Sequence, residues 1–525
     1  MNLISALLEQ RELTISPSRV LGLAAALAII YRVVATVYRL YIHPLSKVPG
    51  PKLYAATSVP FEIRNKINGK FVRDMTALHE KYGPVVRVSP DRVAVDGSVA
   101  WPLFMRRYNE EFSKIWQFYG FGPLAILGAG PEAHKRQRRV MAHATSPAAL
   151  ADQEVYLQKH VNKFVDVLGE HADQDKAIDI MIWFNYLTFD IVGELTLGTS
   201  LGCLDSRDSI HPLVGVVTAT TRDNARRLFM TGIPLLGSLV PMATYLLRKK
   251  EITKILDMQR HMESQAEARI ALGTDTRTDL VTYMLRANQE DKGKGMSHEE
   301  MLVNSRVLLL AGGETTATAL SGFVFHITND PTAYKTLADE VRGTFSSADA
   351  ITIRATSQLP YLCACIDETL RIYPPAADIP PAGIARHRRV RTIVSVYEWA
   401  THHSAEHFAD PESFAPQRWL PATHALYDAR FAADNNAVCK PFSAGPRDCT
   451  GKILAYAEMR LAITRLFWHF DFVREAGQDD WIAGQCVFTL AEKGPLRIRL
   501  RRRAGQYRSP KGDEEHMGQE SLYLC

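Results

Sequence analysis

The chain has 525 residues, of which 46% are hydrophobic and 23% charged, the balance of an ordinary globular protein. The net charge of +5 is small for this length, and no basic stripe with interleaved aromatic residues occurs, so the sequence argues against a nucleic-acid-binding protein. The seven cysteines are odd in number and scattered, which predicts free thiols in a reducing compartment rather than a disulfide framework.

Residues 20–42 form an apolar run that is long enough to span a bilayer as one helix, since about 20 residues suffice. Arg32 interrupts the run at a cost of roughly 2.5–3.5 kcal/mol at mid-membrane, so a buried amphipathic helix is the alternative. The run starts late and lacks a small-residue cleavage site, which disfavours a removable signal peptide. Arg39 lies near its end, and Lys47 and Lys52 follow it, which favours a cytoplasmic body.

The apolar run divides the chain into an N-terminal membrane segment and a globular part. Residues 1–19 are expected to be a lead, and residues 20–42 a transmembrane anchor. Residues 43–52, with three prolines and a glycine, are expected to be a stiff, non-helical hinge. Residues 53–503 are then expected to form one globular domain, and residues 504–525 a polar tail.

The first part of the globular domain mixes helical and β patterns. Residues 71–82 are predicted as a helix, and the β-rich runs 85–88 and 92–95 as a hairpin, because a Ser-Pro-Asp turn separates them. Residues 112–130 are loop-like and rich in aromatic residues and glycine. They are candidates for substrate contacts.

Residues 133–142 are predicted as a basic helix on which His134 and Arg138 lie one turn apart on the same face. A solvated run of charges is the alternative. The chain from 152 to about 265 is predicted to be mainly helical. Within it, residues 231–241 form an apolar loop that either packs on the body or touches the membrane.

A capping box at residues 297–300 predicts the start of a long helix that runs to about Asn329. Gly312 and Gly313 lie in its interior and cost about 1 kcal/mol each relative to alanine, so they need a reason. Close packing between helices is one reason. The other is room for a small ligand, in which case Glu314 and Thr315 supply a carboxylate and a hydroxyl facing that space.

Two further regions have recognisable local patterns. Residues 359–373 are predicted as a helix on which Glu368 and Arg371 form a pair, a weak signal by itself. Near the end of the chain, residues 487–490 and 495–500 are predicted as two strands joined by 491–494.

Cys449 is predicted to lie in a turn just before a helix that begins near Lys452. A helix N-terminus favours negative charge, so a thiolate there is a candidate soft metal ligand or nucleophile. The alternative is a buried structural cysteine. Gly445 permits unusual backbone angles, and Gly451 lets a flat cofactor approach closely.

Residues 442–451 resemble the haem-binding loop of the cytochrome P450 family, Phe-x-x-Gly-x-Arg-x-Cys-x-Gly, at every fixed position. Residues 311–316 resemble the oxygen-activation motif of that family, Ala/Gly-Gly-x-Asp/Glu-Thr-Thr/Ser. Glu368 and Arg371 match its Glu-x-x-Arg pair. Residues 414–419 resemble its Phe-x-Pro-Glu-Arg-Phe/Trp element, with glutamine for the usual glutamate.

The resemblance implies a role for each matching residue. Cys449 would be the axial thiolate ligand of haem b. Thr315 would hydrogen-bond the dioxygen being activated, and Glu314 would relay protons inward from solvent. Glu368, Arg371 and Arg418 would form a buried structural triad. The expected cofactor-binding residues are His134, Arg138, Ala311, Phe442, Gly445, Arg447 and Gly451, of which Arg447, Arg138 and His134 would face the haem propionates.

One stretch departs from the family pattern. After the Glu-x-x-Arg helix the family has a β-hairpin with a propionate-binding arginine or histidine, and a Pro-x-Gly-Thr turn. Pro381 stands where that arginine is expected, the turn motif is absent, and the stretch is several residues short. Arg386 is the candidate substitute, and a haem-poor, inactive homologue is one alternative reading of the chain.

The implied fold is mainly α, a helical triangular prism with small β-sheets and one N-terminal transmembrane helix. The sequence is most similar to microsomal cytochromes P450 of fungal secondary metabolism. That implies a single-pass protein of the endoplasmic reticulum membrane with its catalytic domain facing the cytoplasm. The expected reaction is monooxygenation of a lipophilic small molecule with O2. A haem-dependent rearrangement or dehydration without O2 is the other alternative.

No glycine-rich nucleotide or flavin fingerprint follows a strand, so electrons must come from another protein. The resemblance implies NADPH-cytochrome P450 reductase, with cytochrome b5 as a further donor.

Overall fold

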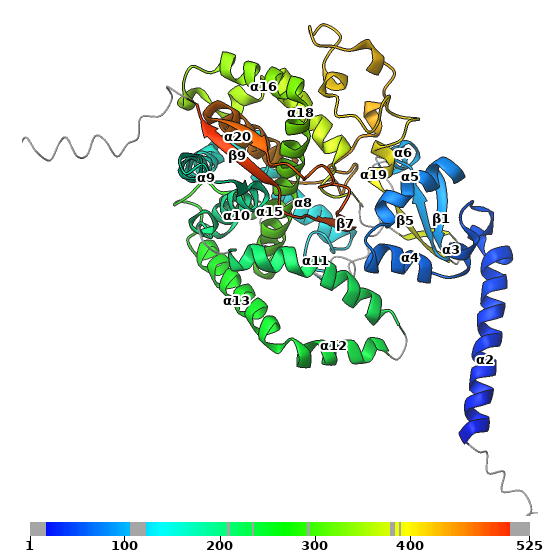
Figure 1. Cartoon of the computed structure of the whole chain (residues 1–525). Coiled ribbons are helices and arrows are strands. Elements are labelled where there is room, and N and C mark those ends of the chain that lie inside the picture. The colour runs from blue at the N-terminus through cyan, green and yellow to red at the C-terminus, as the bar shows by residue number, and fades with distance from the viewer. Residues whose placement is uncertain are drawn as a thin grey trace, which may run out of the picture.

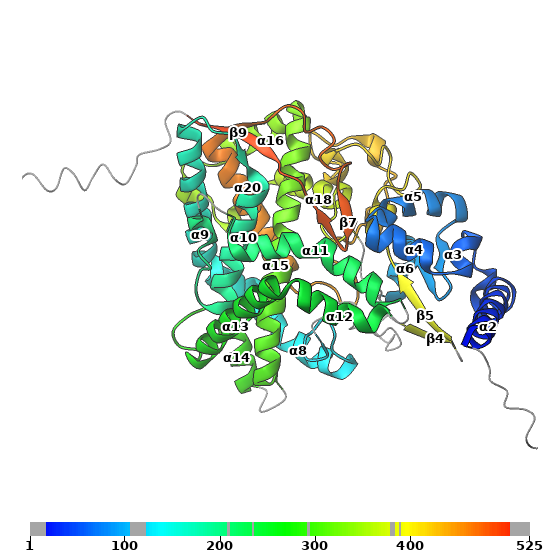
Figure 2. The same ribbon diagram turned by 60° about the horizontal axis from the view of Figure 1, so that its bottom comes forward.

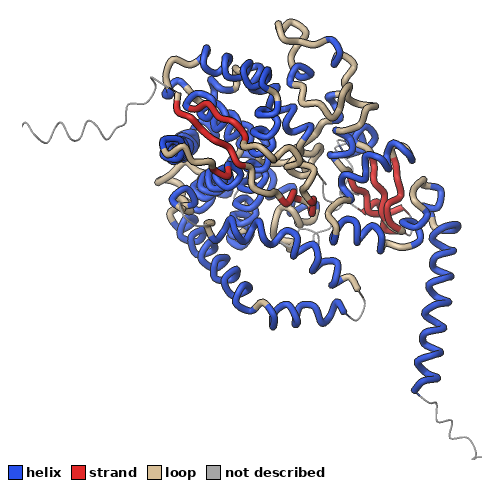
Figure 3. The backbone as a smooth tube through the Cα atoms, in the orientation of Figure 1, coloured by secondary structure: helices blue, strands red, loops and turns tan. Residues whose placement is uncertain are grey.

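The computed structural model describes residues 17–104, 122–206, 210–233, 236–290, 295–377, 384–387 and 390–503 (Figure 1). The expected contacts in residues 112–121, the stretch around Pro381 and the polar tail lie outside these residues. Helices dominate the described part, and strands form three small sheets (Figure 3). The expectation of a mainly helical fold with small β-sheets is therefore confirmed.

The helices, in chain order, are α2 (Pro17–Val37), α3 (Lys52–Ala56), α4 (Val59–Glu62), α5 (Phe71–Tyr82), α6 (Gly97–Phe104), α8 (Pro131–Ala144), α9 (Pro147–Asp173), α10 (Ile180–Leu197), α11 (Pro212–Thr231), α12 (Leu236–Leu247), α13 (Lys249–Ala271), α14 (Leu280–Glu290), α15 (His298–Asn329), α16 (Pro331–Thr344), α17 (Ile353–Thr356), α18 (Pro360–Ile372), α19 (Glu398–His402) and α20 (Lys452–His469). The strands are β1 (Val85–Ser89), β2 (Arg92–Val95), β3 (Ile178–Asp179), β4 (Ile384–His387), β5 (Val390–Ser395), β6 (Phe470–Arg474), β7 (Cys486–Phe488), β8 (Leu490–Glu492) and β9 (Arg497–Arg502).

The sheets combine segments that are far apart in the sequence. The first has the order β1-β2-β5-β4, in which only the β2–β5 pair is parallel. The second has the order β3-β9-β6, and the third is the β7–β8 hairpin. The hairpin predicted over residues 85–95 is confirmed as β1–β2, and the hairpin expected after the Glu-x-x-Arg helix is present as β4–β5.

Helix α15 runs through the middle of the helical body, as both views show (Figures 1 and 2). The predicted capping box opens it, because the Ser297 hydroxyl accepts from the Glu300 amide while the Glu300 carboxylate accepts from the Ser297 amide. Helix α10, almost wholly buried, packs along it. This pair forms the centre of the largest hydrophobic core.

The N-terminal helix projects away from the body (Figure 1), and no residue of α2 is buried. It continues as a π-helical segment, η1 (Tyr38–Ile42), so the apolar helix extends over Pro17–Ile42. The alternative of a helix buried in the body is therefore wrong. α10 and α15 are also long and apolar enough to cross a membrane, but they are mostly buried inside the protein.

The connection between this helix and the body is held by hydrogen bonds. Arg87, buried in β1, donates to the backbone oxygen of Arg39 at 2.8 Å. Arg39 in turn donates to the backbone oxygen of Ala56 at 2.9 Å. The prediction that this hinge is non-helical is wrong, because Pro44–Lys47 form a 3-10 helix.

Two predicted boundaries are also wrong. The stretch 231–241 is mostly helical, since α11 ends at Thr231 and α12 begins at Leu236. Pro241, the sixth residue of α12, lacks an N–H and so removes one helical hydrogen bond, yet the helix continues to Leu247. Near the C-terminus the chain reverses at Thr489, whose φ is +80°, so residues 490–492 form β8 and do not simply join two strands.

Candidate functional site

Cys449 lies in a loop that folds back on itself before α20. Its amide donates to the backbone oxygen of Phe442 at 2.9 Å, and the Asp448 amide donates to Gly445 oxygen at 3.1 Å. Gly445 has a φ of +85°, a conformation that residues with a Cβ avoid. The predicted turn just before a helix is thus the geometry observed.

The Cys449 side chain is solvent-accessible although it lies deep among surrounding atoms, so it lines an internal space rather than the outer surface. Burial raises the pKa of the Cys449 thiol, and the backbone N–H groups of Gly451 and Lys452 lower it in part. A Cβ added at Gly451 would meet nothing closer than the Cys449 sulfur at 3.9 Å. The sulfur thus has open space beside it, and its thiolate form needs a further positive partner such as a metal ion.

Two arginines connect this loop to α8. Arg138 of α8 forms an ion pair with the Asp448 carboxylate and also donates to the Asp448 backbone oxygen. Arg447 donates to the backbone oxygen of Ala129, just before α8, at 2.9 Å. His134 lies buried on the same helix. Two guanidinium groups therefore lie near Cys449, where the sequence predicted contacts to cofactor carboxylates, and that of Arg138 is paired with Asp448.

One face of α15 is accessible at the middle of the protein. Leu308, Ala311, Gly312 and Thr315 recur with helical spacing and are at least partly accessible, as is Leu310, among largely buried neighbours. The Thr315 hydroxyl donates to the backbone oxygen of Ala311 at 2.6 Å. Its hydrogen is engaged within the helix, while its oxygen lone pairs remain available to accept.

The two glycines of this helix are explained by packing. A Cβ at Gly312 would lie 2.9 Å from the Val192 side chain, and a Cβ at Gly313 would lie 2.7 Å from the Phe189 ring. The hydroxyl of Thr188 also donates to the Gly313 backbone oxygen at 2.8 Å. The structure therefore supports close packing against α10 rather than room for a ligand at these two positions.

Glu314 is buried, and its Oε1 forms an ion pair with the ammonium of Lys493. The same ammonium donates to the Thr318 hydroxyl at 2.6 Å. Glu314 Oε2 is buried and has no hydrogen-bond partner among the residues that the structure describes. One oxygen of this carboxylate is thus fixed, and the other is left without a partner.

A second buried acid stands behind the same segment of α15. Glu458 of α20 hydrogen-bonds with Thr316. Burial raises the pKa of Glu458 to about 8, and that hydrogen bond lowers it only in part. Glu458 is therefore mostly protonated at neutral pH.

The structure brings the three triad residues together. Arg371 donates twice to the Glu368 carboxylate at 2.8 Å, and Arg418 donates to it at 3.1 Å. None of the three side chains is exposed. Trp419 and the Ala415 amide complete the coordination of the carboxylate at 2.9 and 2.8 Å. Arg371 further donates to three backbone oxygens, so the cluster fixes the segment that leads into the Cys449 loop.

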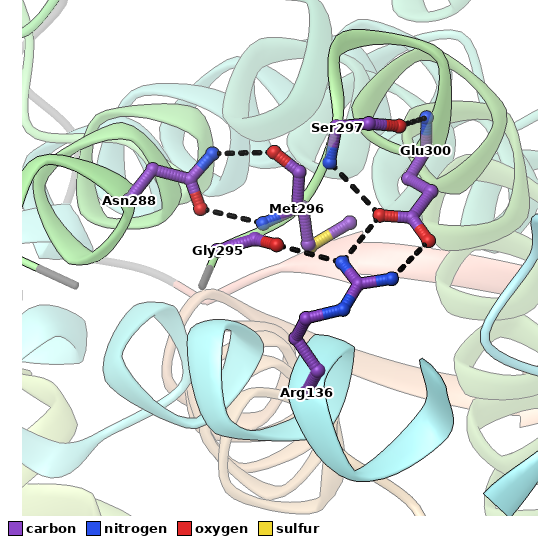
Figure 4. A pocket seen from close by; sticks show the side chains of 6 residues that line it. All are labelled: Arg136, Asn288, Gly295, Met296, Ser297 and Glu300. Carbon is purple, nitrogen blue, oxygen red and sulfur yellow. Dashed lines mark hydrogen bonds and ion pairs between the residues drawn. The ribbon is translucent and has the colours of Figure 1, made fainter. Parts of the chain in front are cut away.

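A surface cavity of about 320 Å³ lies elsewhere, where α8 meets α14 and the start of α15 (Figure 4). Arg136 and Glu300 close it with two hydrogen bonds of 2.6 Å. Arg136 and Arg138 are two residues apart on α8 and point to different sides. The cavity therefore lies on the side of α8 away from Cys449, and its charged groups are already paired.

Three residues of this site were missed by sequence reasoning: Asp448, Glu458 and Lys493. Asp448 lay inside a recognised motif, at a position where the motif accepts any residue. Lys493 contacts Glu314 across 179 positions of sequence, and no local pattern signals such a contact. Of Arg386 the structure describes only the backbone, in β4.

Comparison with known proteins agrees with this arrangement. The family model described as Cytochrome P450 matches residues 49–495. A cytochrome P450 monooxygenase of Hormonema carpetanum is 36% identical, over 90% of this chain and 94% of its own. Averantin hydroxylase of Dothistroma septosporum is 34% identical, over 92% and 91%. Trichothecene C-15 hydroxylase of Fusarium sporotrichioides is 33% identical, over 91% and 98%.

Proposed function

The chain belongs to the cytochrome P450 family and is a monooxygenase, and we propose that it inserts one oxygen atom from O2 into a lipophilic intermediate of fungal secondary metabolism. Two relatives named as hydroxylases, of averantin and of a trichothecene, support that substrate class. Electrons come from NADPH through a separate reductase, with cytochrome b5 as a further donor.

The observation that carries the proposal is the Cys449 loop. Its sulfur faces an internal space, Gly451 leaves open space beside the sulfur, and two arginines lie within the same loop or are bonded to it. The open space beside Gly451 and the cationic groups around it fit a flat, dianionic cofactor such as haem b. Cys449 would hold the iron, and Arg138, Arg447 and His134 would bind the propionates.

Haem, when bound through a thiolate, supplies an iron centre whose electron density favours O–O cleavage. The chain's own residues bind and position the reactants. Phe442 packs its ring 5.3 Å from that of Tyr456 and shields the sulfur from water. On α15, Ala311 leaves room beside the helix. Thr315 donates its own hydrogen to Ala311 and therefore accepts, at its hydroxyl oxygen, a hydrogen bond from a proton-bearing reactant beside α15. Glu314 takes up and releases protons at its carboxylate.

The exposed apolar helix supports anchoring in the endoplasmic reticulum membrane, with the catalytic domain in the cytoplasm. Helix α12 adds a second apolar surface, because Leu239, Met242, Tyr245 and Leu246 are each more than half exposed. α12 lies at the lower edge of the body in Figure 1, the side toward which α2 extends. We therefore assign the apolar stretch around α12 to membrane contact.

The test is reconstitution of the full-length protein with an NADPH-cytochrome P450 reductase, using isotopically labelled O2 and extracts from a deletion strain as the substrate source. The proposal expects NADPH-dependent conversion of one accumulated metabolite, with one labelled oxygen atom in the product. Conversion without NADPH and without label would instead establish a rearrangement or dehydration at haem.

A further inference from the structure

Both side chains of the ion pair between Glu314 and Lys493 are buried. The Lys493 side chain is 2% exposed and that of Glu314 6%. Burial of an ammonium is costly unless it is paired and hydrogen-bonded. Here the ammonium contacts both Glu314 and Thr318, one turn apart on α15, and Thr318 in turn donates to the Glu314 backbone oxygen at 2.8 Å. Lys493 therefore has a fixed place on the helix.

The segment that carries Lys493 is itself held on both sides. The preceding residue, Glu492 at the end of β8, forms an ion pair with Arg222 of α11. The following residue, Gly494, accepts a hydrogen bond of 2.8 Å from the Trp481 indole. The end of β8, which carries Lys493 to α15, is thus bonded to α11 on one side and to the C-terminal loops on the other. Lys493 therefore loses little conformational freedom when it binds Glu314.

The contact has different consequences for the two carboxylate oxygens of Glu314. Oε1 is occupied by the ammonium, whereas Oε2 is buried without a partner in the described part of the chain. A buried polar atom that stays unpaired in a native structure needs a reason, and proton exchange is one. Among other titratable groups, Tyr373 has its pKa raised chiefly by burial and in smaller part by Glu314, and its hydroxyl already donates to Gln485 at 2.7 Å.

We propose that Lys493 is a positioning residue for the proton relay, which holds Oε1 of Glu314 and leaves Oε2 as the oxygen that exchanges protons. The proposal rests on the proposed monooxygenase function. Lys493 gives this buried carboxylate its counter-charge, and a buried charge that loses its partner is costly. It also prevents the side chain from rotating away from its place on α15.

The test uses purified holoenzyme of the parent, Lys493→Met, Lys493→Arg, Glu314→Gln and the double variant Lys493→Met/Glu314→Gln. Lys335→Met is the matched control, since Lys335 pairs with Asp339 on the surface and both side chains are more than 60% exposed. In thermal unfolding at neutral pH, Lys493→Met should lower the midpoint by several degrees, and the added Glu314→Gln should restore most of it. Additive effects of the two substitutions would overturn the buried pair.

A second measurement reports on protonation. The infrared difference between Lys493→Met and the double variant should contain a protonated carboxyl band, which the difference between the parent and Glu314→Gln should lack. A protonated Glu314 band in the parent would contradict the proposal.

The third measurement separates a positioning role from a structural one. With reductase, NADPH and substrate, Lys493→Met should lower the product-to-NADPH ratio by up to about 10²-fold, whereas Lys493→Arg and Lys335→Met retain most of it. Equal loss in Lys493→Met and Lys493→Arg would reduce Lys493 to a packing residue. An unchanged product-to-NADPH ratio in Glu314→Gln would show that Glu314 relays no protons, which is a failure of the proposed function. The thermal unfolding of the variants tests the buried ion pair independently of that outcome.

Discussion

Glu368 and Arg371, one turn apart on α18, share two hydrogen bonds of 2.8 Å in a position where neither side chain is exposed. Arg418 joins them from η6 (Pro416–Trp419). A pair at this spacing is worth a few tenths of a kcal/mol on an exposed helix. When the pair is buried, removal of either member leaves the other charge without a partner. The loss of stability is therefore much larger here than on an exposed helix.

Glu368→Gln should therefore destabilise the protein by about 3–5 kcal/mol, the cost of breaking a buried ion pair from one side. The matched control is Asp257→Asn, because Asp257 and Arg260 have the same spacing but are exposed. That substitution should cost less than about 1 kcal/mol. Thermal unfolding of both variants measures the two losses of stability. Equal losses would show that the triad has no special structural role.

Thr315→Ala should preserve the fold and uncouple the reaction, so that NADPH is consumed, peroxide accumulates and product falls by about 10²-fold or more. The reason is that the hydroxyl faces the accessible side of α15. Thr328→Ala is the control, because Thr328 makes the same bond to its own helix, to Val324 oxygen at 2.7 Å, near the end of α15. If the product-to-NADPH ratio is unchanged in Thr315→Ala, its hydrogen bond to Ala311 is structural and the oxygen-independent alternative gains support.

Deleting residues 1–37 should release most of the protein from membranes and leave the haem site intact, with residual binding through α12. Deleting residues 1–42 should release it equally but lower its thermal stability. The second deletion removes the Arg39 oxygen that accepts from buried Arg87 at 2.8 Å. Membrane flotation and thermal unfolding separate the two effects. Recovery of the full-length chain in the soluble fraction would mean that the apolar helix is no anchor.

Glu458 predicts a pH dependence of stability. Its pKa rises from an ordinary 4.5 to about 8 in the folded protein because it is buried. Between these values the folded state binds more protons than the unfolded state, so this contribution to stability is present below pH 4.5 and is lost as the pH rises toward 8. Glu458→Gln should flatten the fall in unfolding temperature over that window, and an identical slope in parent and variant would contradict the assignment.

The parts of the fold that the sequence predicted correctly depend on neighbouring residues. The capping box of Ser297 and Glu300 is such a case, and so is the turn before Cys449, where the glycines and the following helix lie within ten residues. Pro241 was misread because helix breakers also occur inside short helices. Thr489 was misread because β-branched residues rarely adopt a positive φ.

The motif residues of the site were predicted from the sequence, and the residues that contact them from elsewhere in the chain were missed. The sequence allowed two explanations for Gly312 and Gly313, close helix packing or room for a ligand. Only the positions of Val192 and Phe189 decide between them. The ion pair of Lys493 with Glu314 depends on the way the C-terminal hairpin meets α15, and tertiary contacts of that kind leave no local pattern.

The central claim is that Cys449 holds the iron of a haem as its thiolate, and the carbon monoxide difference spectrum of the reduced protein tests it most directly. Cys363, partly exposed on α18, provides the control substitution. The parent and Cys363→Ser should show the band position of thiolate-ligated haem, and Cys449→Ser should lose it. Retention of that band in Cys449→Ser, or its absence from a haem-loaded parent, would contradict the account.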